Sequence, residues 1–302
     1  QGPAVFINGN SNVNINKCTM TNNFSGVNGG AIYIENSNVS INNCDIQHNQ
    51  SNIDGGGIYI TSANVNIDSC NVSNNSCFLA GNGGHGGGIS INHVINGSSY
   101  VNISNSMITN NSANTGGGIY TTESYGDITY TEITNNHASG DGGGMTSSQS
   151  NPNLINVTLS NNSAPSGEDL LAAHGSNITV LNTIVWSPIG TIGSSLGSPL
   201  ITVNYSNISG GYSGTGNINS YPVYVDSTNG DFHLQGSSPC IDAGDPAVIY
   251  NDPNGTRNDI GAYPYDACAG ATITGTDIQS ACDSYTWIDG NTYTANNNTA
   301  TY

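Results

Sequence analysis

The side chains in this sequence best suited to catalysis are carboxylates. Those in the middle of the chain are Glu123, Asp127, Glu132, Asp141, Glu168 and Asp169. Two carboxylates that converge on one bond can hydrolyse a glycoside, one as the general acid and the other as base or nucleophile. In the repeat described below, these positions are corners or outward positions one or two repeats apart, so a few of them could share a face. Solvated surface charge is the simpler interpretation of the same residues.

The candidate ligands for a metal ion are Asp245, Asp252, Asn254 and Asp259. Their oxygens alternate along a turn that contains Gly255, as they do in loops that bind calcium. The closing Glu of a complete calcium loop is missing, and Asp-Pro and Asn-Gly are ordinary turn sequences. We expect no cofactor apart from calcium at these residues.

The histidines show no spacing typical of a zinc site. His85, His93, His137 and His174 are scattered along the chain, and no H-x-x-x-H pair links them. His85 lies in a glycine-rich stretch, which favours a turn over a ligand site. The Gly-Gly-Gly runs are not phosphate-binding loops, because no helix and no lysine follow them.

The cysteines indicate structure rather than chemistry. Cys18, Cys44 and Cys70 are separated by 26 residues each time, and no C-x-x-C pair occurs. Such equal spacing predicts a row of buried, unreactive thiols. Cys268 and Cys282 lie outside the row and are the better candidates for a disulfide, which an exported protein would permit.

The charge balance narrows the choice of partners. The 302 residues include two basic side chains, Lys17 and Arg257, against 20 acidic ones, and the formal net charge is −18. Binding to nucleic acid or to an anionic membrane surface needs Lys and Arg, so both are excluded. The same charge would repel the polyuronates that many lyases cleave. Cations and neutral polymers remain as partners.

No apolar run is long enough to cross a bilayer, so we expect no membrane insertion in this segment. The sequence opens in the middle of one pattern and stops in the middle of another. We therefore expect it to be a piece of a longer, processed chain.

A repeat of about 26 residues organises residues 1–210. A full copy has an anchor residue with apolar residues five and three positions before it and two positions after it, and Asn five positions after it; the copies at Thr131 and Val157 keep all but the first of these. Around Cys44 these residues are Val39, Ile41, Ile46 and Asn49. The anchors are Cys18, Cys44, Cys70, Ser106, Thr131 and Val157, with weaker copies at Thr183 and Ser206. About ten extra residues are inserted between Cys70 and Ser106.

A second element, typified by Gly55-Gly56-Gly57-Ile58-Tyr59-Ile60, lies between the anchors. Alternation of apolar and polar residues predicts short strands with one buried face. Because each strand recurs only once per repeat, it pairs with its copy in the next repeat rather than in a hairpin. The sequence therefore predicts an all-β fold, a right-handed parallel β-helix of about eight coils with three short strands per coil. Asn ladders and glycines are expected at its corners.

Tyrosines at one outward position of this helix form a candidate binding surface. Tyr33, Tyr59 and Tyr120 lie between inward-pointing Ile residues of the same strand. A row of such rings could hold a sugar polymer or pack against another protomer. Ordinary β-propensity on an exposed face is the simpler interpretation.

Two stretches near the carboxy terminus resemble known families. Residues 230–234, 238–246 and 254–263 (ending Asp259-Ile260-Gly261-Ala262-Tyr263) resemble the choice-of-anchor Q segment that follows β-helix repeats in many secreted bacterial proteins. Pro264 departs from the acidic residue usual there. We expect residues 211–266 to form a cap that closes the open end of the helix.

Residues 281–293 are similar to the start of a small β module, which we place at 267–302. That module recurs in giant surface proteins of gliding Bacteroidota, often adhesins exported by the type IX system. Together the two resemblances imply an extracellular protein of the cell surface.

These observations favour a non-catalytic structural and adhesive segment of a large bacterial cell-surface protein, in a filament or appendage. Its expected partners are other protomers, in a homo-oligomer, or glycans of a cell or prey surface. The alternative is a polysaccharide-degrading enzyme, a hydrolase or lyase that acts through the carboxylates between Glu123 and Asp169.

Overall fold

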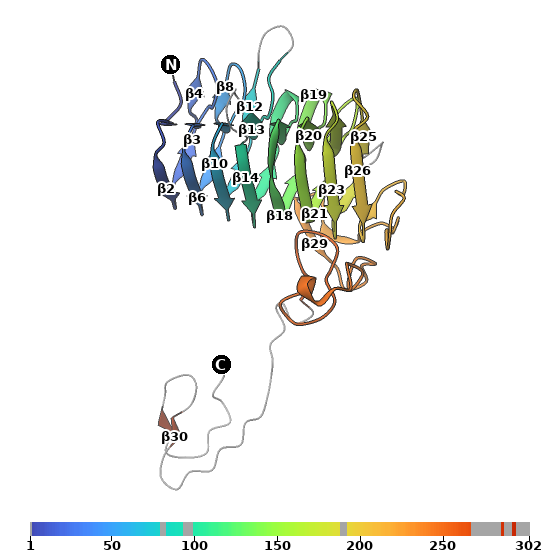
Figure 1. Ribbon diagram of the computed structural model, residues 1–302. Helices are drawn as coiled ribbons and strands as arrows, with labels where there is room; N and C mark the ends of the chain where they lie inside the picture. The colour runs from blue at the N-terminus through green and yellow to red at the C-terminus, as the bar shows by residue number, and fades with distance from the viewer. Residues whose placement is uncertain are drawn as a thin grey trace. The chain divides into compact units, whose positions relative to one another are not determined.

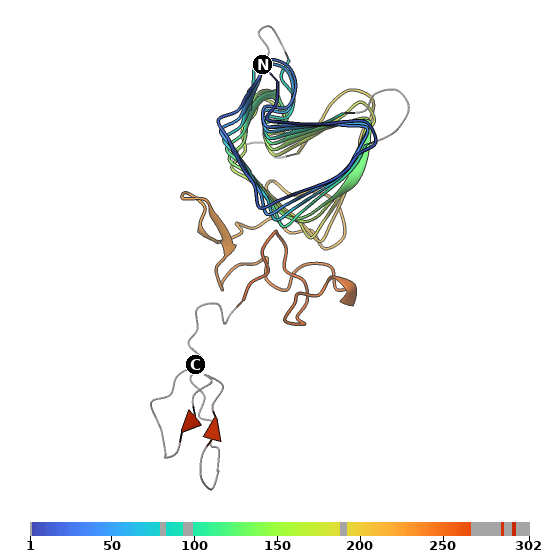
Figure 2. The same cartoon turned by 90° about the vertical axis from the view of Figure 1, so that its left-hand side faces the viewer.

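The computed structural model describes residues 2–78, 83–92, 99–187 and 192–266, and the backbone of residues 285–286 and 292–293. The chain divides into two compact units, Gln1–Tyr265 and Asp266–Tyr302. The first is a parallel β-helix of about seven turns, which confirms the predicted fold class with slightly fewer coils than expected (Figure 1). Seen nearly end-on in Figure 2, successive coils superimpose around one closed outline.

Three parallel sheets form the walls of the helix. The first contains one strand from each coil and carries the Ile-x-Ile segments of the repeat. Its strands are β1 (Val5–Ile7), β5 (Ile32–Glu35), β9 (Ile58–Thr61), β13 (Ile89–Asn92), β17 (Ile119–Thr122), β20 (Met145–Ser148), β22 (Leu170–Ala173) and β25 (Ile192–Ser194).

The second sheet has two limbs, one on each side of the anchor residue. The first limb contains β2 (Asn12–Asn16), β6 (Asn38–Asn42), β10 (Asn64–Asp68), β14 (Ser99–Ser104), β23 (Asn177–Leu181) and β26 (Leu200–Asn204). The second contains β3 (Thr19–Thr21), β7 (Asp45–Gln47), β11 (Asn71–Ser73), β15 (Met107–Thr109), β24 (Ile184–Trp186) and β27 (Asn207–Ile208). The long strands β18 (Ser124–Thr134) and β21 (Asn151–Ser160) run through both limbs.

A third, shorter sheet follows the second limb. It contains β4 (Phe24–Ser25), β8 (Gln50–Ser51), β12 (Ser76–Cys77), β16 (Ser112–Thr115) and β19 (His137–Asp141). The early coils therefore have four short strand segments rather than the three expected, because a bend at the anchor divides the second sheet. That bend is a single residue in the left-handed region, such as Asn43 (φ 53°), Ser69 (φ 54°) or Asn105 (φ 48°). Asn is among the few side chains that tolerate this conformation well.

Identical side chains stack inside the helix. Ile41 pairs in register with Ile67, and Ile67 with Ile103, and all three are fully buried. Burial of one such side chain contributes about 1.5–3 kcal/mol. Because each coil repeats these contacts with its neighbour, the stability of the helix is a sum over adjacent coils.

A buried asparagine ladder runs along one corner. In each coil the Asn side chain accepts a backbone N–H from the preceding coil, and its Nδ2 donates to the next Asn. The Nδ2–Oδ1 distances from Asn49 to Asn75 and from Asn75 to Asn111 are 3.0 and 3.1 Å. Each Nδ2 also donates to a carbonyl of the preceding coil, as Asn75 does to Ile46 at 2.8 Å. The members are Asn23, Asn49, Asn75, Asn111, Asn136 and Asn162.

The glycine runs of the sequence pack against this ladder. A Cβ atom on Gly88 would lie 2.8 Å from the Gly118 carbonyl oxygen and 3.0 Å from Asn111 Nδ2. Gly86, at φ 68°, also has a backbone conformation that other residues rarely adopt. The Gly-Gly-Gly motif is thus explained by close coil-to-coil packing.

Residues 211–266 lie mainly along the side of the helix. Only the stretch around Thr215–Ile218 extends the last turn, where Ile208 N donates to Ile218 O at 3.0 Å. From Tyr221 the chain continues along the outer face of β18, β21 and β24, through an antiparallel pair, β28 (Tyr224–Asp226) and β29 (Asp231–Leu234), and a 3-10 turn, η1 (Val248–Tyr250). We call residues 221–265 the lateral segment.

The lateral segment thus lies against the side of the helix, whereas residues 211–266 were expected to close its open end. The physical reason is a second apolar core between this segment and the side of the helix. It contains Ile184, Tyr224, Phe232, Leu234, Cys240 and Ile260. Ile184 occupies an outward position and supplies the apolar surface that the lateral segment covers.

In the second unit the described backbone is an antiparallel pair, β30 (Tyr285–Thr286) and β31 (Thr292–Tyr293). Cys268 and Cys282 lie outside the described residues, so their predicted disulfide stays a prediction. In the part of the chain that the structure describes, no helix is long and apolar enough to cross a membrane.

Candidate functional site

The predicted tyrosine row lies on the outer face of the first sheet. Tyr33 on β5 is in register with Tyr59 on β9, and their rings stack with centroids 5.1 Å apart and an interplanar angle of 25°. Phe6 on β1 extends the stack at 5.0 Å and 20°. Exposure falls along the row, from 57% at Phe6 to 8% at Tyr59. Burial, with the nearby Tyr33 and Asp54, raises the pKa of Tyr59 to about 12.

The row is interrupted at β13, where Ser90 stands between Tyr59 and Tyr120. His85, from the segment before β13, packs against Tyr120 with ring centroids 4.5 Å apart. Asp54 holds this histidine, since its Oδ1 accepts from His85 N at 2.9 Å and lies 3.0 Å from His85 Nδ1. The sequence predicts only a turn at His85 and does not predict its contacts with Asp54 and Tyr120. Asp54 and His85 each precede the positive-φ glycine of their repeat, a spacing that could have revealed that they are neighbours.

Ring stacking limits what this row can bind. The faces of Tyr33 are turned towards Phe6 and Tyr59, so a sugar ring could lie flat only on the outer face of Phe6. Binding at Tyr33, Tyr59 and Tyr120 stays a prediction, with hydrogen bonds to the hydroxyls as its chemistry.

The carboxylates considered for catalysis lie on different elements. Asp127 and Glu132 belong to β18, Asp141 belongs to β19, and Glu168 and Asp169 precede β22. Glu123, in the bend before β18, is exposed, as is Asp141. Asp127 Oδ1 accepts from Asn153 Nδ2 at 2.8 Å.

The two buried carboxylates have structural partners. Glu132 accepts from Thr134 Oγ1 at 2.6 Å and from the Tyr263 hydroxyl at 2.8 Å, and burial raises its pKa. Asp169 Oδ1 accepts from Asn162 Nδ2 and from Ser187 Oγ, both at 2.8 Å. Burial raises the pKa of Asp169 to about 7. Glu132 thus joins the lateral segment to the helix, and Asp169 ends the asparagine ladder.

The thiol row has the predicted structure. Cys44 Sγ accepts from Cys18 N and Cys70 Sγ accepts from Cys44 N, both at 3.4 Å. Ser106 continues the row, with its hydroxyl accepting from Cys70 N at 3.1 Å. Burial raises the pKa of Cys70 to about 11, so its reactive thiolate form is scarce at neutral pH. Cys77 and Cys240 are likewise buried and unpaired by disulfides.

The structure brings together two of the four predicted calcium ligands. Asp252 Oδ2 accepts from Asp259 N at 3.0 Å, and both oxygens of Asp259 accept backbone N–H groups, of Asp242 and Tyr265, at 2.6 Å. Asn254 forms a separate turn with Thr256 N at 2.9 Å. Asp245 accepts from Ala247 N at 2.9 Å.

Among residues 2–78, 83–92, 99–187 and 192–266, no group of three or more His, Cys, Asp and Glu is arranged to hold a metal ion. Calcium therefore stays a prediction centred on Asp252 and Asp259. It requires that calcium raise the unfolding temperature of the parent protein and that Asp252→Ala with Asp259→Ala remove the increase. An unchanged unfolding temperature in the parent would end this hypothesis.

Two further histidines have hydroxyl contacts, whereas His233 Nδ1 lies 2.8 Å from Asp231 Oδ1 in the lateral segment. His137 Nδ1 lies 2.9 Å from Ser163 Oγ, and His174 Nδ1 lies 3.1 Å from Ser148 Oγ. His93 lies outside the described residues. Neither hydroxyl contact includes a carboxylate that would make a catalytic pair.

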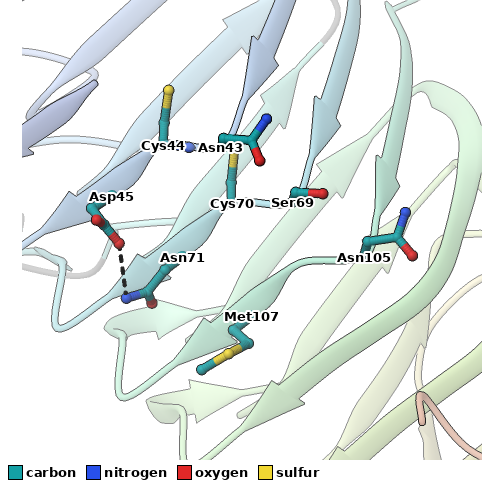
Figure 3. A pocket seen from close by; sticks show the side chains of 8 residues that line it. All are labelled: Asn43, Cys44, Asp45, Ser69, Cys70, Asn71, Asn105 and Met107. Atoms are coloured by element: carbon teal, nitrogen blue, oxygen red, sulfur yellow. Dashed lines mark hydrogen bonds between the residues drawn. The ribbon is translucent and has the colours of Figure 1, made fainter. Parts of the chain in front are cut away.

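A groove that the sequence did not predict runs along the anchor corner of coils two to four. It has a volume of about 320 Å³ (Figure 3). The close-up shows Asp45, Asn71 and Met107 on successive strands along one side, and Asn43, Ser69 and Asn105 at the bends along the other. The buried thiols of Cys44 and Cys70 lie at its floor. An exposed Met107 at an otherwise polar outward position is the sequence feature that could have indicated it.

One comparison with known proteins finds a relation. Residues 17–35 match the model of the Chlamydia polymorphic membrane protein repeat. This stretch extends from the Cys18 anchor through Asn23 to β5, which is most of one structural repeat. No curated protein and no solved structure matches the chain.

Proposed function

We propose that this chain is a non-catalytic structural and adhesive segment of a large bacterial cell-surface protein. The observation that carries the proposal is the use of its polar side chains. Asparagines, hydroxyls and thiols at the corners bond from coil to coil, and Glu132 and Asp169, the buried members of the candidate catalytic carboxylates, bond to the same structure. A rod built in this way has a regular surface, and its buried polar groups form hydrogen bonds within the rod that stabilise it.

The match of residues 17–35 to a repeat of polymorphic membrane proteins supports a place at the cell surface. The net charge of −18 and the scarcity of basic residues favour neutral polymers or other protein surfaces as partners. The resemblance of residues 281–293 to modules of gliding Bacteroidota supports export by the type IX system.

The adhesive part of the proposal is assigned to the first sheet. Tyr33, Tyr59 and Tyr120 present hydroxyl groups to a glycan or to another protomer. Replacing all three by Phe keeps the stack and removes these hydroxyls, so it should weaken attachment to purified surface glycans or assembly in sedimentation. Unchanged attachment and assembly would exclude the row as the adhesive surface. The exposed Tyr212, replaced by Phe, is the matched control.

The enzymatic alternative is tested on the purified chain. Incubation with a panel of neutral and acidic polysaccharides should release neither reducing ends nor unsaturated sugars. Release that disappears in one of the variants Glu123→Gln, Asp127→Asn, Asp141→Asn or Glu168→Gln would overturn the proposal and identify a catalytic carboxylate.

A further inference from the structure

Two rows of residues follow the anchor corner through six consecutive coils. The outward row contains, in register from strand to strand, Asp45, Asn71, Met107, Glu132, Thr158 and Ile184. The bend row contains Asn43, Ser69, Asn105, Tyr130, Asn156 and Asn182, all in the left-handed region with φ between 46° and 54°. The groove of Figure 3 is the part of this corner in coils two to four.

In coils five to seven the chain's own residues 258–263 occupy the same corner. Asn156 Nδ2 donates to Asn258 Oδ1 at 3.0 Å and to Asp259 O at 3.1 Å. Gly261 N donates to Asn182 O at 2.9 Å. These contacts attach a bent stretch of chain to the bend row through backbone groups and the side chains of Asn156 and Asn258.

The same peptide also contacts the three members of the outward row in coils five to seven. Ala262 N donates to Thr158 Oγ1 at 3.0 Å, and the Tyr263 hydroxyl donates to Glu132 Oε2 at 2.8 Å. A Cβ atom on Gly261 would lie 2.8 Å from Ile184 Cδ1, so only a residue without a side chain fits there. From Gly261 to Tyr263 the peptide therefore passes an apolar, a hydroxyl and an acidic side chain on three successive coils.

The open groove repeats this order of chemistry. Asp45, Asn71 and Met107 are acidic, polar and apolar in the same coil order as Glu132, Thr158 and Ile184. In the bend row the backbone conformation corresponds at all three positions, whereas the side chain is the same at one of them, where Asn105 takes the place of Asn182. Met107 is 40% exposed, whereas Ile184, under the peptide, is 1% exposed.

An unused acceptor marks the centre of the open groove. Asn71 Nδ2 is 3.4 Å from Asp45 Oδ1, whereas Asn71 Oδ1 has no hydrogen-bond partner among the described residues. At the equivalent position Thr158 Oγ1 accepts the backbone N–H of Ala262. Asn71 Oδ1 is itself buried, so it could accept a backbone N–H only after the side chain turns and gives up the 3.4 Å contact of Nδ2 with Asp45 Oδ1.

We propose that the groove of coils two to four is a docking site for a peptide of another polypeptide, with a Gly-small-Tyr sequence like Gly261-Ala262-Tyr263 and the same bend at the glycine. The glycine lies against Met107, the following N–H donates to Asn71, and the phenol donates to Asp45. The groove is continuous with an interface that the chain already forms with such a peptide. This inference rests on the adhesive role proposed above. If no peptide binds, the proposal that the chain is not catalytic still stands, because the polysaccharide assay tests that separately.

The test uses a fluorescein-labelled peptide with the sequence of residues 256–265, titrated with the complete chain and followed by fluorescence anisotropy. We expect saturable binding that weakens about tenfold in Asp45→Ala, because a hydrogen bond to a charged acceptor is lost. Met107→Asp should weaken it similarly, and a peptide with Tyr263→Phe should bind wild type and Asp45→Ala alike. Asp141→Ala, which removes an exposed acid on β19, is the matched control.

Circular dichroism of the variants establishes that the exposed substitutions leave the helix folded. Absence of saturable binding to wild type would overturn the proposal. Binding that Asp45→Ala and Met107→Asp leave unchanged would also overturn it, since the peptide would then be exchanging at Glu132 and Ile184. A dimer in sedimentation that the same two variants abolish would support it and identify a second copy as the source of the peptide.

Discussion

The corner groove exists in two states within one molecule. In coils two to four it is open, with Asp45 and Met107 exposed. In coils five to seven the lateral segment covers the equivalent Glu132 and Ile184. The backbone conformation of the bends and the order of side-chain chemistry in the outward row are the same in both stretches. The difference shows that the repeat determines the shape of the groove. Which stretch of the groove is buried depends on where the lateral segment packs.

The largest expected effect comes from placing one charge in each stretch. Ile184→Asp buries an unpaired carboxylate under the lateral segment and should lower the free energy of unfolding by about 5 kcal/mol. Met107→Asp changes an exposed position of the same row and should alter it by less than about 0.5 kcal/mol. Urea denaturation of the two variants measures both. Equal losses would show that the two stretches are equally buried, which contradicts the comparison.

Next in size is a dependence on pH that arises from the buried acids. The pKa of Asp169 is raised to about 7 and that of Glu132 is raised as well, in both cases chiefly by burial. The protonated forms stabilise the fold, so their contribution is complete below about pH 4 and is lost as the pH rises to about 7. The loss for Asp169 should be on the order of 3 kcal/mol.

Unfolding experiments between pH 4 and 8 measure this loss. Asp169→Asn should remove the largest part and Glu132→Gln a smaller part, and the remainder belongs to Asp252 and Asp259, whose pKa burial also raises, for Asp252 to about 6. Asp45→Asn, in the open stretch, should leave the profile unchanged. A wild-type stability that increases from pH 4 to 7 would contradict the burial of these acids.

A smaller effect on stability is expected from the central residues of the two stretches, Thr158 and Asn71. Thr158→Val removes the hydroxyl that accepts the Ala262 N–H and leaves this buried group without a partner, at a cost of about 1–2 kcal/mol. Hydrogen exchange of the lateral segment should increase accordingly. Asn71→Ala, its counterpart in the open groove, should change stability by less than about 0.5 kcal/mol. Comparable losses in the two variants would mean that Asn71 already has a partner.

The features that follow the 26-residue period could be predicted from the sequence. The stacked Ile41, Ile67 and Ile103, the ladder through Asn75 and the thiol row at Cys44 each depend only on contacts with the next coil. Their spacing along the chain therefore reveals their spacing in space. The outward position of the tyrosines follows from the same alternation.

Contacts between residues far apart in the sequence do not follow the 26-residue period, so they could not be predicted from it. Asn156 and Asn258 are separated by 102 residues, and the sequence contains no regular spacing that relates them. The lateral segment was therefore expected over the end of the helix, and Glu132 was grouped with solvated charges. Ile184 and Met107, apolar at outward positions, were the local indications of a covered surface and of an open groove.

The most direct test of the central claim is immunogold electron microscopy of the native cells with an antibody raised against residues 1–265. A non-catalytic surface segment should label fibres, stalks or other structures attached to the cell surface. Label found instead in the medium or on degraded polysaccharide would contradict the account and favour a secreted enzyme that acts through the carboxylates between Glu123 and Asp169.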